Sequence, residues 1–141
     1  MPWYAVVTFF LAALLCAWWL KGLLVQRDRA RDFRITDRRA WQKKWTELEV
    51  LLKQGESSWS VAIIEADKLF DRVLKNMGLP GKDMGERLKF LTRSRRELSY
   101  VWSAHLTRNR LVHESDFRLD RRTAIKTIDT FKRAFKELGV L

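Results

Sequence analysis

The stretch that decides the fold, residues 58–77, reads SWSVAIIEADKLFDRVLKNM. Its apolar side chains recur three or four residues apart, so they fall in one stripe along a helix. Such a stripe is typical of a helix that packs against other helices in a bundle. We therefore expect a helix that begins after Ser57 or Ser58 and ends near Met77 and Gly78. Its buried stripe is predicted to consist of Trp59, Ala62, Ile63, Ala66, Leu69, Phe70, Val73 and Met77.

Similar segments lie on both sides of this helix. On the N-terminal side, residues 38–54 form a helical pattern that Asp37 or Thr36 would cap and Gly55 would end. Its apolar positions are Trp41, Trp45, Leu48, Leu51 and Leu52. On the C-terminal side, the break Gly-Leu-Pro-Gly at residues 78–81 precedes a short predicted helix over residues 84–92.

Two further helices complete the pattern. The fourth is predicted over residues 95–112 and the fifth over residues 121–138, with Asp120 as its N-cap and Gly139 as its stop. The inward side chains of the fifth are predicted to be Ile125, Ile128, Phe131, Phe135 and Leu138.

No stretch alternates with period two, and no glycine-rich phosphate loop is present. The fold class predicted for residues 38–141 is therefore an all-α bundle of four or five helices with short connections. The core is expected to contain the residues at the centres of the stripes, namely Ile63, Ala66, Phe70, Val73, Val101, Ile128, Phe131 and Phe135.

The first residues of the chain have a different character. Residues 3–20 carry no charge, and roughly 20 apolar residues are needed for a helix to cross the hydrocarbon core of a bilayer. We expect a single transmembrane helix within residues 1–25. Trp3 and Tyr4 mark one end of this run and Trp18 and Trp19 the other, as aromatic side chains do at headgroup depth.

A cleaved signal peptide is the alternative to this anchor, but the run lacks both a positive start and a small-residue cleavage site. The single cysteine, Cys16, lies inside the run after bulky Leu15, which argues against a lipoprotein site. One cysteine also excludes a disulfide or a cysteine-based metal site within the chain.

The charges that follow the apolar run predict its orientation. Nine basic residues and three acidic ones lie between Lys21 and Lys44, and residues 26–37 are expected to form a charged juxtamembrane linker. Because positive charge stays inside, the C-terminal domain is expected to be cytoplasmic. The same basic cluster is suited to anionic lipid.

The whole chain is strongly basic, with a net charge of +11 and a pI near 10.3. This charge indicates an anionic partner, either nucleic acid or the anionic inner leaflet. A solvated basic surface that keeps the domain soluble is the alternative.

One motif carries chemistry. Residues 104–114 read AHLTRNRLVHE, in which Arg108 is followed by a polar residue, Asn109, then by three residues and His113. This pattern, near the end of a late helix, resembles the HEPN superfamily of small helical bundles, which are often nucleases. The resemblance covers about residues 38–139 and leaves the membrane segment outside.

The resemblance implies RNA cleavage without a metal ion or other cofactor. The RNA 2′-hydroxyl would attack the adjacent phosphate and leave a cyclic phosphate end. His113 would move protons near neutral pH, and the guanidinium of Arg108 would stabilise the phosphorane charge. The resemblance also implies that two bundles pair, so a homodimer with the motifs at its interface is expected. Arg110 and Arg121 or Arg122 are expected to add positive charge near the motif.

Helix geometry bears on these roles. Residues five apart differ by about 140° around a helix, so Arg108 and His113 do not share a face of a straight helix. Arg108 would have to reach around, or the helix would have to end near His113, or a second subunit would complete the site. Asn109 lies four residues from both His105 and His113, so it is placed to hydrogen-bond an imidazole.

Structural roles for the same residues are the alternative. Arg108 would then pair with a carboxylate such as Glu65 or Asp67, and His113 would interact with the C-terminal end of its helix. His105 is expected to be a bundle-interior histidine. Glu65 and Asp67 are expected at the solvated edges of their helix, although either could orient Arg108 or His113. The tryptophans expected in the core rather than in base stacking are Trp41, Trp45, Trp59 and Trp102.

Two functions follow from these patterns. The first is a membrane-anchored, HEPN-like, metal-independent endoribonuclease. The second is a non-catalytic, membrane-anchored helical module that binds RNA, anionic lipid or a partner protein. Because no sensor domain is recognisable, regulation would come from a separate protein such as an antitoxin.

Overall fold

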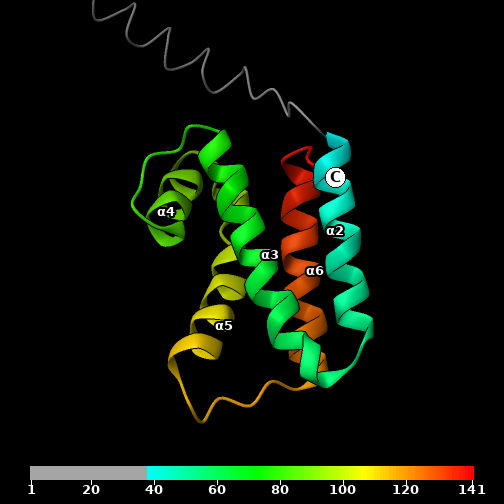
Figure 1. Ribbon diagram of the computed structural model, residues 1–141. Helices are drawn as coiled ribbons and strands as arrows, with labels where there is room; N and C mark the ends of the chain where they lie inside the picture. Colours follow the sequence, from blue (N-terminus) through cyan, green and yellow to red (C-terminus); the bar gives the residue numbers. More distant parts are fainter. Residues whose placement is uncertain (1–37) are drawn as a thin grey trace, which may run out of the picture. The chain divides into compact units, whose positions relative to one another are not determined.

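The computed structural model describes residues 38–141. The expected membrane helix, the expected linker and the expected caps Thr36 and Asp37 lie outside these residues. Within the described part, the chain forms five α-helices and one short 3₁₀ helix, and no strand (Figure 1). None of these described helices combines the length and the hydropathy that a bilayer crossing requires. The prediction of an all-α bundle is confirmed for residues 38–141.

The first two described helices form an antiparallel pair. Helix α2 spans Arg38–Lys53 and helix α3 spans Glu56–Asn76, so α3 begins slightly before the predicted start. Gly55 joins them at a φ of 114°, a backbone conformation that a residue with a Cβ adopts only with strain. The predicted stop at Gly55 is confirmed.

Helix α3 is the centre of the bundle and contacts α2, α4, α5 and α6 (Figure 1). Phe70 of α3 meets Phe135 edge-on, with ring centroids 5.2 Å apart, and it lies 5.8 Å from the Phe131 ring. All eight residues predicted at the stripe centres are at most 2% exposed. The helical period therefore found these eight core residues, but not Leu74, Leu88, Leu91, Leu98 and Val140, which are also fully buried. Trp59 and Met77, predicted in the stripe of α3, are half-buried.

The ends of α4 and α6 lie close to the predicted helix boundaries. Helix α4 spans Met84–Ser94, and α6 spans Arg121–Glu137. Asp120 caps α6 by accepting a hydrogen bond from the Thr123 amide at 2.8 Å. Gly139, with a φ of 73°, follows the end of α6 as predicted.

Two expectations about the later helices were wrong. The fourth helix does not begin at Arg95. Helix α4 continues to Ser94, and a turn must follow before the next helix can begin. A 3₁₀ helix, η1, spans Arg96–Leu98, and α5 spans Val101–His113. Ile125 is 37% exposed rather than inward, since it lies about 100° around α6 from buried Ala124.

Candidate functional site

The motif residues lie on α5, which borders a cleft of about 760 Å³. Side chains from α3, the loop after it, α4 and α5 line this space, which we call the α5 cleft. Arg108, Asn109 and His113 all line it. The structure thus brings the three predicted site residues to one cavity of a single chain.

Arg108 and His113 both lie within α5, so they point about 140° apart around its axis. Both nevertheless line the α5 cleft, and His113 is the last residue of the helix. Of the three arrangements that the spacing allows, the structure has the one in which the helix stops at the histidine. His113 is exposed and also borders the loop that follows α5, together with Arg110 and Phe117.

Four side chains at the base of the cleft form a closed ring of polar contacts. His105 Nδ1 donates to Asp67 Oδ1 at 2.8 Å, and Asn109 Nδ2 donates to His105 Nε2 at 3.2 Å. Arg108 Nη1 then donates to Asn109 Oδ1 at 3.0 Å. The ring closes with Arg108 Nε at 3.5 Å from Asp67 Oδ2.

The direction of these hydrogen bonds assigns a role to each group. A carboxylate only accepts, so His105 carries its proton on Nδ1 and uses Nε2 as an acceptor. The Asn109 amide fills that acceptor and offers its own oxygen to Arg108. Both ring nitrogens of His105 are therefore occupied, and the prediction that His105 is an interior histidine is confirmed.

The expectation for Asp67 was wrong and that for Glu65 was confirmed. Asp67 is only 2% exposed, because it faces α5 and its charge is compensated there by Arg108. It is one of the two carboxylates that the sequence offered as a partner for Arg108. The Glu65 side chain is 42% exposed and pairs with Lys68 at 2.7 Å, as a residue at a solvated edge does.

Arg108 is held in place yet keeps unused hydrogen-bond donors. Its side chain is 25% exposed, and its Nε is buried next to Asp67 without a hydrogen bond. A guanidinium has five N–H donors, and Asn109 takes one of them. Because Arg108 borders the cleft, three donors on its two terminal nitrogens remain for an anion.

Arg110 adds positive charge beside His113, but most of the cations that line the α5 cleft are residues that the sequence did not single out. Arg121 and Arg122 line a different groove, and Arg110 pairs with Glu114 at 3.0 Å while covering the Phe117 ring. The cations that line the α5 cleft beside Arg108 are Lys68, Lys75, Lys82, Arg87 and Lys89. The acidic side chains there are Asp67, Asp71, Asp83 and Glu86.

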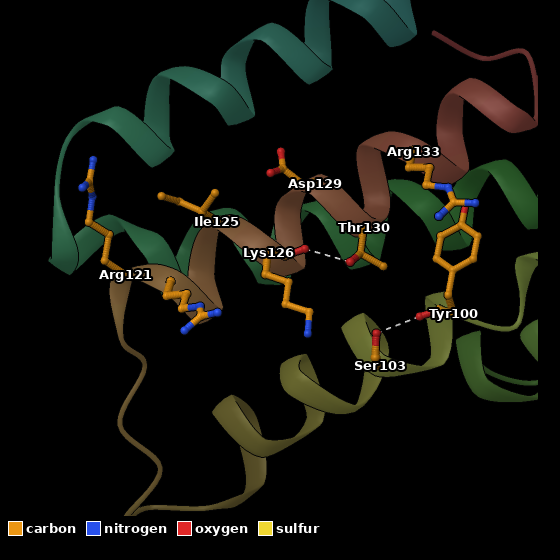
Figure 2. Close-up of a pocket in the computed structure, with 9 residues that line it drawn as sticks. Tyr100, Ser103, Arg121, Ile125, Lys126, Asp129, Thr130 and Arg133 are labelled. Atoms are coloured by element: carbon orange, nitrogen blue, oxygen red, sulfur yellow. Dashed lines mark hydrogen bonds between the residues drawn. The ribbon is translucent and has the colours of Figure 1, made fainter.

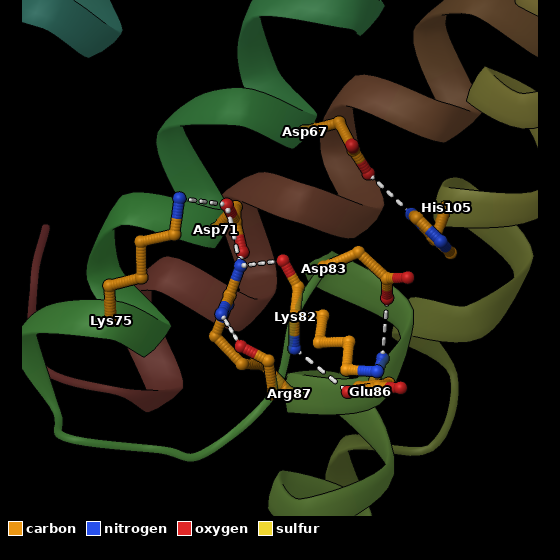
Figure 3. Close-up of polar contacts among 9 residues, drawn as sticks. Asp67, Asp71, Lys75, Lys82, Asp83, Glu86, Arg87 and His105 are labelled. Carbon is orange, nitrogen blue, oxygen red and sulfur yellow. Dashed lines mark hydrogen bonds and ion pairs between the residues drawn. The ribbon is translucent and has the colours of Figure 1, made fainter.

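An ion pair between buried Arg87 and half-buried Asp71 shapes the far wall of the cleft (Figure 3). Arg87 donates from Nε to Asp71 Oδ1 at 2.6 Å, and its Nη1 donates to the Gly81 carbonyl oxygen. Burial raises the pKa of Asp71, but the hydrogen bonds from Arg87 and Lys75 outweigh this and lower that pKa below its usual value. The pair holds the loop after α3 so that its Lys82 borders the cleft.

Gly81 is required at this point of the loop. Its φ is 152°, and an added Cβ would lie 2.8 Å from the Arg87 amide nitrogen. No periodicity signals this contact, but the Gly-Leu-Pro-Gly break marks the loop in which it occurs.

The tryptophan expectations are confirmed in part. Trp45 is 4% exposed and packs on Phe135, whereas Trp41, Trp59 and Trp102 are half-buried. Trp102 lines the cleft and meets the His105 ring edge-on, with centroids 5.9 Å apart.

Comparison of the chain with known protein families, curated proteins and solved structures gave no match. The resemblance to the HEPN superfamily therefore stays a prediction based on the motif.

Proposed function

We propose that residues 38–141 form a HEPN-like domain that binds RNA in the α5 cleft and cleaves it without a metal ion. The observation that carries the proposal is the common cleft of Arg108, Asn109 and His113. A positioned cation and an imidazole without a hydrogen bond to any of residues 38–141 border the same space, which is what cleavage by the RNA 2′-hydroxyl requires.

Each residue has a defined part in the proposed reaction. The His113 imidazole accepts the proton of the 2′-hydroxyl, whose oxygen attacks the neighbouring phosphorus. Arg108 stabilises the negative charge that develops on the phosphoryl oxygens. The bond to the 5′-oxygen breaks, and the imidazolium returns the proton to that oxygen. The products are a cyclic 2′,3′-phosphate and a 5′-hydroxyl.

Asn109 and Asp67 act through Arg108 in this proposal. Asn109 accepts from the guanidinium at 3.0 Å, and Asp67 lies 3.5 Å from its Nε. Neither of these two contacts uses the three N–H donors of Arg108 that remain for phosphate. A cation that is already oriented loses less entropy when it binds the transition state.

The proposal also includes an anchor and a dimer. The aromatic-flanked run at residues 3–20 and the basic residues after it support a membrane-tethered domain that faces the cytoplasm. Tethering raises the effective concentration of chains, so a weak homodimer interface could form there.

The test is cleavage of a mixed RNA by the full-length chain in the presence of EDTA, with analysis of the product ends. We expect cyclic phosphate ends from the wild type and none from His113→Ala or Arg108→Ala. Arg96→Ala is the matched control, because Arg96 is exposed and does not line the cleft. Cleavage that survives both motif substitutions would contradict the proposal.

A non-catalytic binding module is the second candidate. The observation that favours it is the ion pair of Arg108 with Asp67, since this carboxylate competes with phosphate for the guanidinium. For this function we expect a wild-type chain that binds RNA, anionic lipid or a protein partner and produces no cyclic phosphate ends.

A further inference from the structure

A second basic surface lies on the other flank of α5. It is a groove of about 810 Å³ between α5 and α6, which we call the α5–α6 groove (Figure 2). Ser103 of α5 lines it, together with Tyr100, the residue before α5 begins. Ser103 is two residues from His105 and therefore about 200° around the helix from it. The groove and the α5 cleft thus open on opposite sides of α5.

The α6 side of the groove carries a row of cations. Arg122, Lys126 and Arg133 are separated by four and seven residues, which places them within about 40° around the helix. Figure 2 shows Lys126 extending from α6 toward the side where Ser103 and Tyr100 lie. Arg122 and Lys126 have no carboxylate partner among residues 38–141, so their charges are available to a ligand.

Arg133 is held differently from the other two cations. Its Nε pairs with Glu137 at 2.8 Å, and its guanidinium lies 4.3 Å above the centre of the Tyr100 ring. The aromatic contact fixes the cation at one end of the row. Asp129 is the one acidic residue among those that line the groove, and it is exposed.

The dimensions of the row indicate a polymeric anion. Arg122 and Arg133 are eleven residues apart, or about 16 Å along the helix axis at 1.5 Å per residue. One phosphate cannot contact cations over that distance, whereas the backbone of a nucleic acid strand can. A bilayer surface is flat and would meet only the protruding side chains, but a strand enters a concave groove.

The groove also offers apolar surface beside its charges. Ile125 is 37% exposed, and Tyr100 contributes its ring. Grooves that bind single strands without sequence preference combine cations that follow the backbone with apolar or aromatic side chains against the bases. We propose that the α5–α6 groove binds single-stranded RNA through its phosphate backbone, as a site separate from the α5 cleft.

This inference rests on the proposed function for its choice of RNA, so its test must not depend on cleavage. The probe is a fluorescent single-stranded RNA of about 12 nucleotides, within the range that such sites cover. All its 2′-hydroxyls are methylated, because this blocks the attacking oxygen. Binding to the full-length chain in an uncharged detergent is measured by anisotropy at several salt concentrations.

The variants differ only in where charge is removed. Arg122→Gln combined with Lys126→Gln should weaken binding by about tenfold or more and reduce the salt slope by about 1.4, at roughly 0.7 for each lost phosphate contact. Arg96→Gln combined with Lys136→Gln removes the same charge from exposed residues that do not line the groove. This control should bind like the wild type. Asp129→Asn should bind more tightly, because it removes the opposing charge.

Equal weakening in both double variants would overturn the inference, since it would mean that only the net charge matters. Unchanged RNA binding with reduced binding to phosphatidylserine vesicles would overturn it in favour of a membrane surface. Cleavage of unmodified RNA is scored separately. A chain that binds through the groove but never cleaves supports this inference and contradicts the ribonuclease. A chain that cleaves RNA, but whose RNA binding is unchanged by the groove substitutions, supports the ribonuclease and contradicts this inference.

Discussion

His105 and Asp67 lie thirty-eight positions apart in the chain, and their side chains meet at 2.8 Å in the interior of the bundle. Both are almost completely buried, at 7% and 2% exposure. This contact joins α5 to α3 directly beneath the motif. It also sets the position of Asn109 and, through Asn109, that of Arg108.

Replacing the buried carboxylate should therefore destabilise the domain. Asp67→Asn keeps the shape but removes the charge opposite Arg108 and weakens the acceptor of His105. We expect the free energy of unfolding in urea to fall by about 1–3 kcal/mol, the usual effect of a buried polar group left poorly paired. Glu65→Gln is the matched control on the same helix and should change it by less than about 0.5 kcal/mol. Equal effects of the two variants would refute the role given to Asp67.

The aromatic core makes a second stability prediction. Phe131 is fully buried against Phe70, so Phe131→Ala should lower the free energy of unfolding by about 3–5 kcal/mol. Phe90 is 42% exposed, and Phe90→Ala should cost about 1 kcal/mol or less. Both values are measured by chemical denaturation of the same full-length chain. A small effect at Phe131 would show that its face of α6 is not in the core.

Tyr100 should ionise later than an ordinary tyrosine. Burial raises its pKa from 10.0 to about 12, and the charge of Glu137 adds to the effect. The chain has two tyrosines, so the ultraviolet titration should show a component near 12 that Tyr100→Phe removes. A titration completed near 10 in the wild type would contradict the buried position of this hydroxyl.

The same shift predicts how stability depends on pH. Between the unfolded value of 10.0 and the folded value of about 12, the folded state retains the phenol proton that the unfolded state has lost. Rising pH across this window therefore favours unfolding. The wild type should lose stability there relative to Tyr100→Phe.

Mixing two inactive variants tests whether one chain supplies the whole site. Arg108 and His113 line one cleft of a single chain, so a mixture of Arg108→Ala and His113→Ala should remain without cleavage activity even if the chains pair. Recovery of activity in the mixture would show that each site takes its arginine and its histidine from different subunits.

The predicted topology can be tested without purification. A reporter fused after Leu141 should be active when it requires the cytoplasm, because nine basic residues follow the apolar run between Lys21 and Lys44. Strong activity of a reporter that requires the periplasm would reverse the predicted orientation.

The sequence by itself determined most of the helices and most of their inward residues. Helical spacing placed Phe70, Val73 and Phe131 in the core, and Asp120 and Gly139 marked the ends of α6. These features depend on neighbours within a few residues, such as the Asp120 carboxylate and the Thr123 amide. Local backbone geometry is sufficient to predict them.

Only the tertiary structure decided which side chains surround the motif. Asp67 looked like a solvated edge because its position on α3 says nothing about the helix that covers it. The pairing of Arg87 with Asp71 and the separation of Arg122 from the α5 cleft likewise depend on how helices pack. Helical periodicity gives the angle of a side chain around its own axis, but the partner across an interface is set by the packing of helices distant in the sequence.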